Sequence, residues 1–192
     1  RIFLNIAYAN EYLRETTPEK LAERNADDQL KEKVAGFRNE ARVLRAMNYY
    51  FLMDLYGNVP FIDENFPIGS NEVVQRDRSF FFPWIEFELK AVEGKLPPAD
   101  KAHYGMVNDP TVWMLLAKMY LNAEVYTGQE RYDDCLYYLN KVLGAGFSID
   151  PTYSNMFCAD NHNSPEIIFP IVYDGRRAAT FGGTTFLIAA SQ

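Results

Sequence analysis

The sequence predicts a mostly α-helical fold, and three observations lead to this prediction. Apolar residues recur at intervals of three and four over most of the chain, which is the period of helices buried along one face. Proline, glycine and asparagine residues divide these stretches into about five helices. Only two short stretches, at residues 59–62 and 166–173, have the β-branched character of strands.

Length, composition and charge limit the possible functions. The chain has 192 residues, 48% of them hydrophobic, so we expect one domain with a buried core. The formal net charge is −7 and the basic residues are scattered, which argues against a nucleic-acid partner. Cys135 and Cys158 fit neither a metal motif nor a disulfide framework, and Cys135 is expected in the core.

Two helices are predicted at the start of the chain. Residues 1–15 carry an apolar stripe that ends before Pro18, and the polar residues 19–26 are expected to form a helical turn or a loop. The second helix is long and covers about residues 27–56. Replacing Leu44 in it with Ala is expected to cost about 2–5 kcal/mol. Its predicted buried stripe consists of Val34, Phe37, Ala41, Leu44, Phe51 and Leu55, widened by Met47 and Leu52.

The long helix ends in a turn. Gly57 stands where a helix needs a left-handed C-cap, and Pro60 blocks any continuation of the helix. Residues 57–78 have few periodic apolar positions and are predicted to form a loop with a short extended piece at residues 59–62. Long loops in compact domains are often functional.

Proline residues mark the next helix. Its expected start is Pro83, because the first turn of a helix tolerates proline, with Ser79 as the candidate cap. The pair beginning at Pro97 stops it.

The last two predicted helices form a pair. After a loop at residues 99–108, one helix runs from an Asp109 cap to about Tyr126, and the other covers about residues 130–143. Their pattern resembles a degenerate tetratricopeptide repeat, in which small and aromatic residues of two helices pack together. Stacked helix pairs of this kind share a continuous core with their neighbours.

The chain changes character after residue 146. Residues 1–146 are expected to form a helical, repeat-like scaffold, and residues 147–192 a region of loops and short strands in the same single domain, 1–192. Residues 166–173 are predicted to form an edge strand, because Pro170 cannot donate to a sheet. Both ends of the sequence fall within periodic stretches, so we expect a fragment truncated at both ends.

The sequence holds no specific catalytic constellation. His103 and His162 are far apart and are expected to be surface or loop residues, and metal, phosphate and dinucleotide motifs are absent from the sequence. Asp133 and Asp134 are adjacent on a helix, so their side chains diverge and do not form the facing pair of a glycosidase. We therefore expect a protein that is not an enzyme and uses no cofactor or metal.

Binding chemistry fits the sequence better than catalysis. Sugars stack their C–H faces on aromatic rings and give their hydroxyls to polar side chains. Helical aromatic residues are mostly core, so the candidates are those in loops, although nothing in the spacing shows that they converge. The candidate ligand-binding residues are Phe66, Tyr104, Tyr153, Tyr173 and Phe181, with polar companions Asn71, Arg76, His103, Asn108, Asn161 and Asp174.

Four motifs, in order, resemble one known family. Residues 40–60, EARVLRAMNYYFLMDLYGNVP, resemble the E-A-R-x-L-R-A helix and L-Y-G-x-V-P turn of the SusD-like (RagB/SusD) family. Residues 86–97 (EFELKAVEGKLP), 115–124 (LLAKMYLNAE) and 163–169 (NSPEIIF) resemble later segments of that family. The chain departs from the pattern at residues 105–111, where the family often has Arg-x-Thr-x-x-Ala.

The resemblance implies a cell-surface lipoprotein of the Gram-negative outer membrane. Such proteins bind a polysaccharide or oligosaccharide, or in some members a peptide, and deliver it to a SusC-type TonB-dependent transporter. The implied fold is an α-helical superhelix of tetratricopeptide-like pairs, without catalytic activity or cofactor, and the implied lipid anchor lies outside this sequence. The family's ligand contacts lie in variable loops, so none is carried over to a residue here.

Two other hypotheses remain open. A helical-repeat adaptor could bind a protein through the concave face of the repeat at residues 111–143, although stable arrays usually need about three repeats. A glycoside hydrolase would need two carboxylates within about 10 Å of each other across a cleft.

Overall fold

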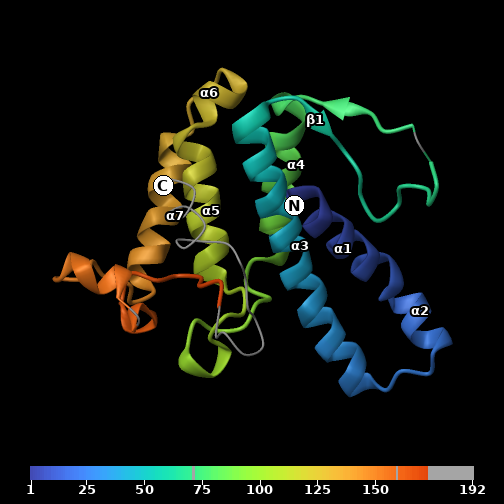
Figure 1. The fold of residues 1–192 in the computed structure, drawn as a ribbon, viewed down its shortest axis with the longest axis horizontal. Coiled ribbons are helices and arrows are strands. Elements are labelled where there is room, and N and C mark those ends of the chain that lie inside the picture. Colours follow the sequence, from blue (N-terminus) through green and yellow to red (C-terminus); the bar gives the residue numbers. More distant parts are fainter. Residues whose placement is uncertain (71, 159, 173–192) are drawn as a thin grey trace, which may run out of the picture.

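The computed structural model describes residues 1–70, 72–158 and 160–172, and it confirms a mostly α-helical fold (Figure 1). Within this part of the chain there are seven α-helices, three short 3-10 helices and one antiparallel pair of strands. The elements are α1 (Ile2–Glu15), α2 (Pro18–Glu23), α3 (Asp28–Tyr56), β1 (Val59–Pro60), β2 (Gln75–Arg76), α4 (Arg78–Val92), α5 (Asp109–Leu121), α6 (Ala123–Thr127) and α7 (Tyr132–Gly144), with 3-10 turns at Lys101–His103, Tyr153–Phe157 and Asn161–Asn163.

The long helix α3 is the centre of the arrangement. Helices α1 and α4 both pack along α3, and α7 packs along α5 on the other side of the molecule (Figure 1). Helix α4 also contacts α5 and α6, so it joins the two groups of helices. Buried side chains of these helices form one continuous core, whose largest fully buried members are Tyr49, Tyr120, Phe81, Ile6, Met53 and Ile85.

The ends of α3 follow from its sequence. The Asp27 side chain accepts a hydrogen bond from the Leu30 N–H at 2.7 Å, which caps the N-terminus of the helix. Gly57 has a φ of 75°, which a glycine adopts readily, but its ψ of −76° lies outside the left-handed helical region, so the predicted left-handed C-cap is wrong in its ψ. Before α3, the polar segment expected to be a turn or a loop contains α2, which the Thr17 side chain caps.

The predicted buried face of α3 is mostly wrong, because only Leu52 of the predicted residues is buried. Leu44, Phe51 and Leu55 are 36%, 40% and 63% exposed. Both α1 and α4 pack on α3, and part of this contact is made by polar side chains such as Arg45, which is 2% exposed. A stripe chosen from apolar residues alone therefore points in the wrong direction. The residues of α3 that are buried are Val43, Arg45, Ala46, Asn48, Tyr49, Tyr50, Leu52 and Met53.

Helix α4 starts earlier than predicted. Its cap is Asp77, whose carboxylate accepts the Phe80 N–H at 3.1 Å, so neither the Ser79 cap nor the Pro83 start is correct. The Ser79 hydroxyl donates to the same carboxylate at 2.6 Å. Pro83 lies inside the helix, where its missing N–H removes one backbone hydrogen bond.

Helix α5 is also capped one residue earlier than predicted. The side-chain oxygen of Asn108 accepts the Thr111 N–H at 3.0 Å, while the Asp109 carboxylate accepts the Gly94 N–H at 2.8 Å. Asp109 therefore ties the end of α4 to the start of α5. The predicted single helix up to Tyr126 is divided at Asn122 into α5 and α6.

The predicted repeat-like helix pair is confirmed in α5 and α7. The rings of Tyr120 and Tyr138 are stacked with their centroids 5.8 Å apart. Leu116, Ala117 and Cys135 are buried beside them, as small and aromatic residues are in repeats of this kind.

Only one of the two predicted extended segments forms a strand in the described residues. Val59 pairs with Arg76 across the β1–β2 ladder, so the short extended piece predicted at residues 59–62 is confirmed at Val59–Pro60. Residues 166–172 contain a turn at Glu166 and a bend at residues 168–169 but no strand, so the strand predicted there is wrong up to Val172. Pro170 has no N–H for a ladder, and the Ile168 carbonyl accepts instead from the Asn108 side chain at 3.1 Å. None of the described helices combines the length and the apolar character that crossing a membrane requires.

Candidate ligand-binding site

A cavity of about 200 Å³ lies where the loop of residues 99–108 meets the segment of residues 162–170. Tyr104, one of the five predicted ligand-binding aromatic residues, lines this cavity. The predicted polar companions His103 and Asn108 line it too. The complete lining is Ala99, Asp100, His103, Tyr104, Gly105, Asn108, Phe147, His162, Ile167, Ile168 and Pro170.

Tyr104 and His162 form the aromatic part of this cavity. Their ring centroids are 6.4 Å apart with an interplanar angle of 75°, which is an edge-to-face arrangement. The Tyr104 side chain is 44% exposed. A half-exposed ring of this kind offers an apolar face to a ligand while one edge stays fixed by its neighbour.

The second histidine of the cavity is held by a carboxylate. His103 Nδ1 lies 2.7 Å from Asp100 Oδ1, and the same oxygen accepts the His103 backbone N–H at 3.0 Å. The side-chain hydrogen bond from His103, followed by its backbone bond and charge, lowers the pKa of the Asp100 carboxyl despite some desolvation. Both histidines lie in short 3-10 turns of the connecting segments, and His162 is at the surface as predicted. The structure adds that both line one cavity, which their separation in the sequence did not indicate.

Two residues shape the cavity rather than face a ligand. Gly105 has a φ of 85°, and a Cβ atom on it would lie 2.9 Å from Cγ2 of Val172. The Asn108 amide donates to the Ile168 carbonyl, while its oxygen accepts from the Thr111 N–H and hydroxyl. The amide of Asn108 is thus occupied on both sides by the protein, so it holds the two walls together.

The arrangement suits one small polar ligand with an apolar face. The Tyr104 ring and the apolar side chains of Phe147 and Ile167 can contact C–H groups, and the two imidazoles can exchange hydrogen bonds with hydroxyls. The volume is below the range of roughly 300–1,000 Å³ that is common for drug-sized ligands. A single sugar unit of a longer chain fits these properties.

Among the described residues, the structure does not bring the other predicted aromatic residues to this cavity. Phe66 is partly buried in the loop after β1, where its carbonyl accepts a hydrogen bond from Arg14 at 3.2 Å. Tyr153 is 79% exposed, and its ring lies 5.1 Å from that of Phe157. Phe157 is not among the predicted residues, although its spacing of four from Tyr153 was an available signal. Tyr173 and Phe181, with their companions Asn71 and Asp174, lie outside the described residues.

Several carboxylates of the helical scaffold have structural partners. The Tyr120 hydroxyl donates to Glu86 at 2.6 Å, and the Tyr126 hydroxyl donates to Asp54 at 2.7 Å. Burial, reinforced by these carboxylates, raises the pKa of both phenols far above the ordinary value. These groups connect helices to one another, and none of them lines the cavity at Tyr104.

Comparison with curated proteins identifies a sequence relative. The chain is 36% identical over 160 residues to the starch-binding protein SusD of Bacteroides thetaiotaomicron. The match covers 81% of this chain and 28% of SusD, so the chain spans less than a third of that relative. A scan against family models finds no match.

Solved structures of glycan-binding proteins share the fold. A laminarin-binding SusD-like protein superposes with a TM-score of 0.71 at 24% identity, over 88% of this chain and 35% of its own. Surface glycan-binding protein A from Bacteroides thetaiotaomicron, in complex with laminarihexaose, has a TM-score of 0.60 at 26% identity, over 74% of this chain and 29% of its own. The corresponding protein from Bacteroides uniformis has a TM-score of 0.65 at 22% identity, over 84% and 34%.

Proposed function

The chain belongs to the SusD-like family, and from this membership we propose that it is part of a non-catalytic, cell-surface glycan-binding protein. The observation that carries the proposal is the 36% identity to starch-binding SusD over 160 residues. SusD is a starch-binding protein, and the SusD-like protein with the similar fold is a laminarin-binding protein. The ligand class that follows is a polysaccharide or its oligosaccharides.

The partner and the location follow from the same family. We propose that the intact protein delivers its glycan to a SusC-type TonB-dependent transporter and is held at the outer membrane by a lipid anchor. The resemblance of the four sequence motifs to the family supports this proposal. Co-purification of such a transporter with the intact, tagged protein is the expected result, and repeated purification without any transporter would contradict it.

Tyr104 is the residue that we propose contacts the glycan. It is the predicted aromatic residue that lines a cavity and keeps an exposed face, and it has two imidazoles beside it. Stacking of one ring contributes about 0.5–1.5 kcal/mol beyond the area it buries. Loss of the Tyr104 ring should therefore weaken glycan binding measurably.

Calorimetry of the intact protein against starch and laminarin oligosaccharides tests the proposal. We expect binding of at least one glycan, and a weaker affinity by roughly tenfold in Tyr104→Ala, given that about 1.4 kcal/mol corresponds to a factor of ten. Tyr8→Ala is the matched control, because Tyr8 is an exposed aromatic residue on α1, 66% exposed. Equal affinities in the two variants would exclude Tyr104 from the site, and no binding to any glycan would contradict the proposed function.

A further inference from the structure

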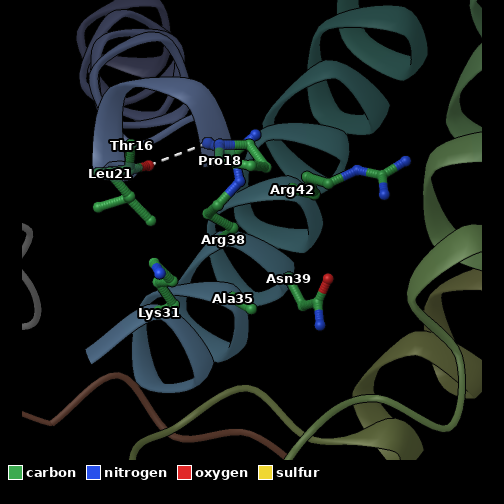
Figure 2. Close-up of a pocket in the computed structure, with 8 residues that line it drawn as sticks. All are labelled: Thr16, Pro18, Leu21, Lys31, Ala35, Arg38, Asn39 and Arg42. Atoms are coloured by element: carbon green, nitrogen blue, oxygen red, sulfur yellow. Dashed lines mark hydrogen bonds between the residues drawn. The ribbon is translucent and has the colours of Figure 1, made fainter. Parts of the chain in front are cut away.

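A second cavity, of about 260 Å³, lies between α2 and α3 (Figure 2). Residues along one face of α3 form one wall, and the opposite wall is formed by the end of α1 and by α2. The lining consists of Thr16, Pro18, Leu21, Lys31, Ala35, Arg38, Asn39 and Arg42. Three of these eight residues are cationic, and none is acidic.

The positive charge of this cavity is only partly compensated. Arg42 leans away from it, toward α4, where its Nη2 atom lies 2.9 Å from Glu88 Oε1 (Figure 2). Lys31 lies 3.2 Å from Asp28, a side chain that is fully exposed to solvent. A surface pair of that kind contributes little and leaves the ammonium available to a competing anion.

Arg38 is the central cation of the cavity. Figure 2 shows its side chain extending from α3 across to Thr16. Its Nη1 atom donates to the Leu13 carbonyl at 2.6 Å and to the Thr16 hydroxyl at 2.9 Å, both neutral acceptors. Among the described residues, no carboxylate oxygen lies within 4.0 Å of Arg38. The guanidinium is thus held in place on one side, while its remaining N–H groups have no anionic partner there.

The cavity also has an apolar part. Leu21 and Pro18 on one wall and Ala35 on the other present hydrocarbon next to the cations. A free phosphate or chloride ion would use only the charges, whereas a carboxylate carried by an organic ring would use both parts. A guanidinium matches a carboxylate well, because its planar N–H groups can bind two oxygens at once.

We infer that the cavity between α2 and α3 binds the carboxylate of an acidic sugar, such as a uronic-acid unit of a glycan. Arg38 and Lys31 bind the carboxylate, and Leu21 with Pro18 contacts the C–H face of the ring. The choice of a sugar as the carrier of the carboxylate rests on the proposed function, whereas the preference for an oxyanion rests on the charges alone. Glu19 is exposed and is not part of the lining; a backbone hydrogen bond and the Thr17 side chain lower the pKa of its carboxyl most, and the charge of Arg38 adds a smaller effect.

Calorimetry of the intact protein with glucuronate, glucose, acetate and inorganic phosphate tests the inference. We expect glucuronate to bind more tightly than the other three, and its binding to weaken in 1 M salt, where charges are screened within about 3 Å. Arg38→Gln should weaken glucuronate binding at least about tenfold, because it removes charge-assisted hydrogen bonds. Glu19→Gln should strengthen it slightly, because it removes a negative charge that interacts with Arg38. Lys118→Gln, an exposed charge change on α5, is the matched control.

Each outcome decides between the possibilities. Unchanged glucuronate affinity in a folded Arg38→Gln protein would overturn the inference. If Arg38→Gln fails to fold, Lys31→Gln and Glu19→Gln replace it, and equal affinities in both variants would overturn it as well. Acetate or phosphate binding as tightly as glucuronate would overturn the sugar assignment. Binding of neutral glycans and its loss in Tyr104→Ala concern the other cavity, so failure of that experiment is distinguishable from failure of this one.

Discussion

Arg45 of α3 and Glu88 of α4 form a buried ion pair in which Nη2 lies 2.9 Å from Oε2, with side-chain exposures of 2% and 8%. Arg42 donates to the same carboxylate through Nε at 3.1 Å and Nη2 at 2.9 Å. Arg45 also donates to Asn10 of α1 at 2.8 Å and to Glu64. The two arginines of the E-A-R-x-L-R-A motif therefore connect α3 to its neighbours, so the motif is structural.

Removal of the Glu88 carboxylate should destabilise the protein strongly. Glu88→Ala leaves two guanidinium groups without their shared partner, and breaking a buried pair in this way costs about 3–5 kcal/mol. Chemical denaturation monitored by circular dichroism measures the change. Glu130→Ala, at an exposed position before α7, should change the free energy of unfolding by no more than about 0.5 kcal/mol. Similar stabilities of the two variants would show that the buried pair contributes little.

The same carboxylate should make stability depend on acid pH. Burial opposes ionisation of Glu88, but hydrogen bonds and charges from Arg42 and Arg45 outweigh burial and lower its pKa from the ordinary 4.5. A lowered pKa in the folded state stabilises the protein above pH 4.5, and this contribution is lost as pH falls through the folded pKa. Unfolding measured from pH 7 to pH 3 should show a steeper loss of stability in the wild type than in Glu88→Gln. If the stabilities of the two proteins fall in parallel with pH, groups other than Glu88 cause the acid sensitivity.

Shortening Met53 should cost more stability than shortening Leu44, although the sequence predicted that Leu44 is on the buried face of α3. Met53 is fully buried, so Met53→Ala should cost about 2–5 kcal/mol. Leu44 is 36% exposed, so Leu44→Ala should cost less than about 2 kcal/mol, below the range for buried leucines. Denaturant titration of both variants gives the comparison. A larger loss for Leu44→Ala would mean that this face of α3 is covered in the intact protein.

Glycine at position 105 should be required for the shape of the Tyr104 cavity. Gly105→Ala forces a residue with a Cβ atom to adopt a φ of 85° and places that atom 2.9 Å from Val172. We expect a loss of about 1–3 kcal/mol and weaker glycan binding. Gly144→Ala is the control, because a Cβ atom on Gly144 in α7 would have nothing within 4 Å of it, and alanine there should be neutral or stabilising. Full stability and unchanged binding in Gly105→Ala would contradict the strain at this turn.

Local chemistry made much of the helical framework predictable. The end of α3 at Gly57, which has a positive φ, follows from the preference of a single residue, and it is found. The predicted caps of α4 and α5 are wrong because each helix start offers two polar residues within two positions. Which of Asp77 and Ser79, or of Asn108 and Asp109, accepts the free N–H depends on the loop that leads into the helix.

The sequence by itself determined the helical class, the repeat-like pair and the family, because periodicity and motifs are properties of neighbouring residues. Only the tertiary structure decided which face of α3 is buried, since that depends on where α1 and α4 pack and on the partners of Arg45. It also decided that Tyr104 shares a cavity with His162 while Phe66 and Tyr153 lie elsewhere. Residues so far apart in the chain come together because of the paths of the loops between them. The spacing of these residues in the sequence does not predict those paths.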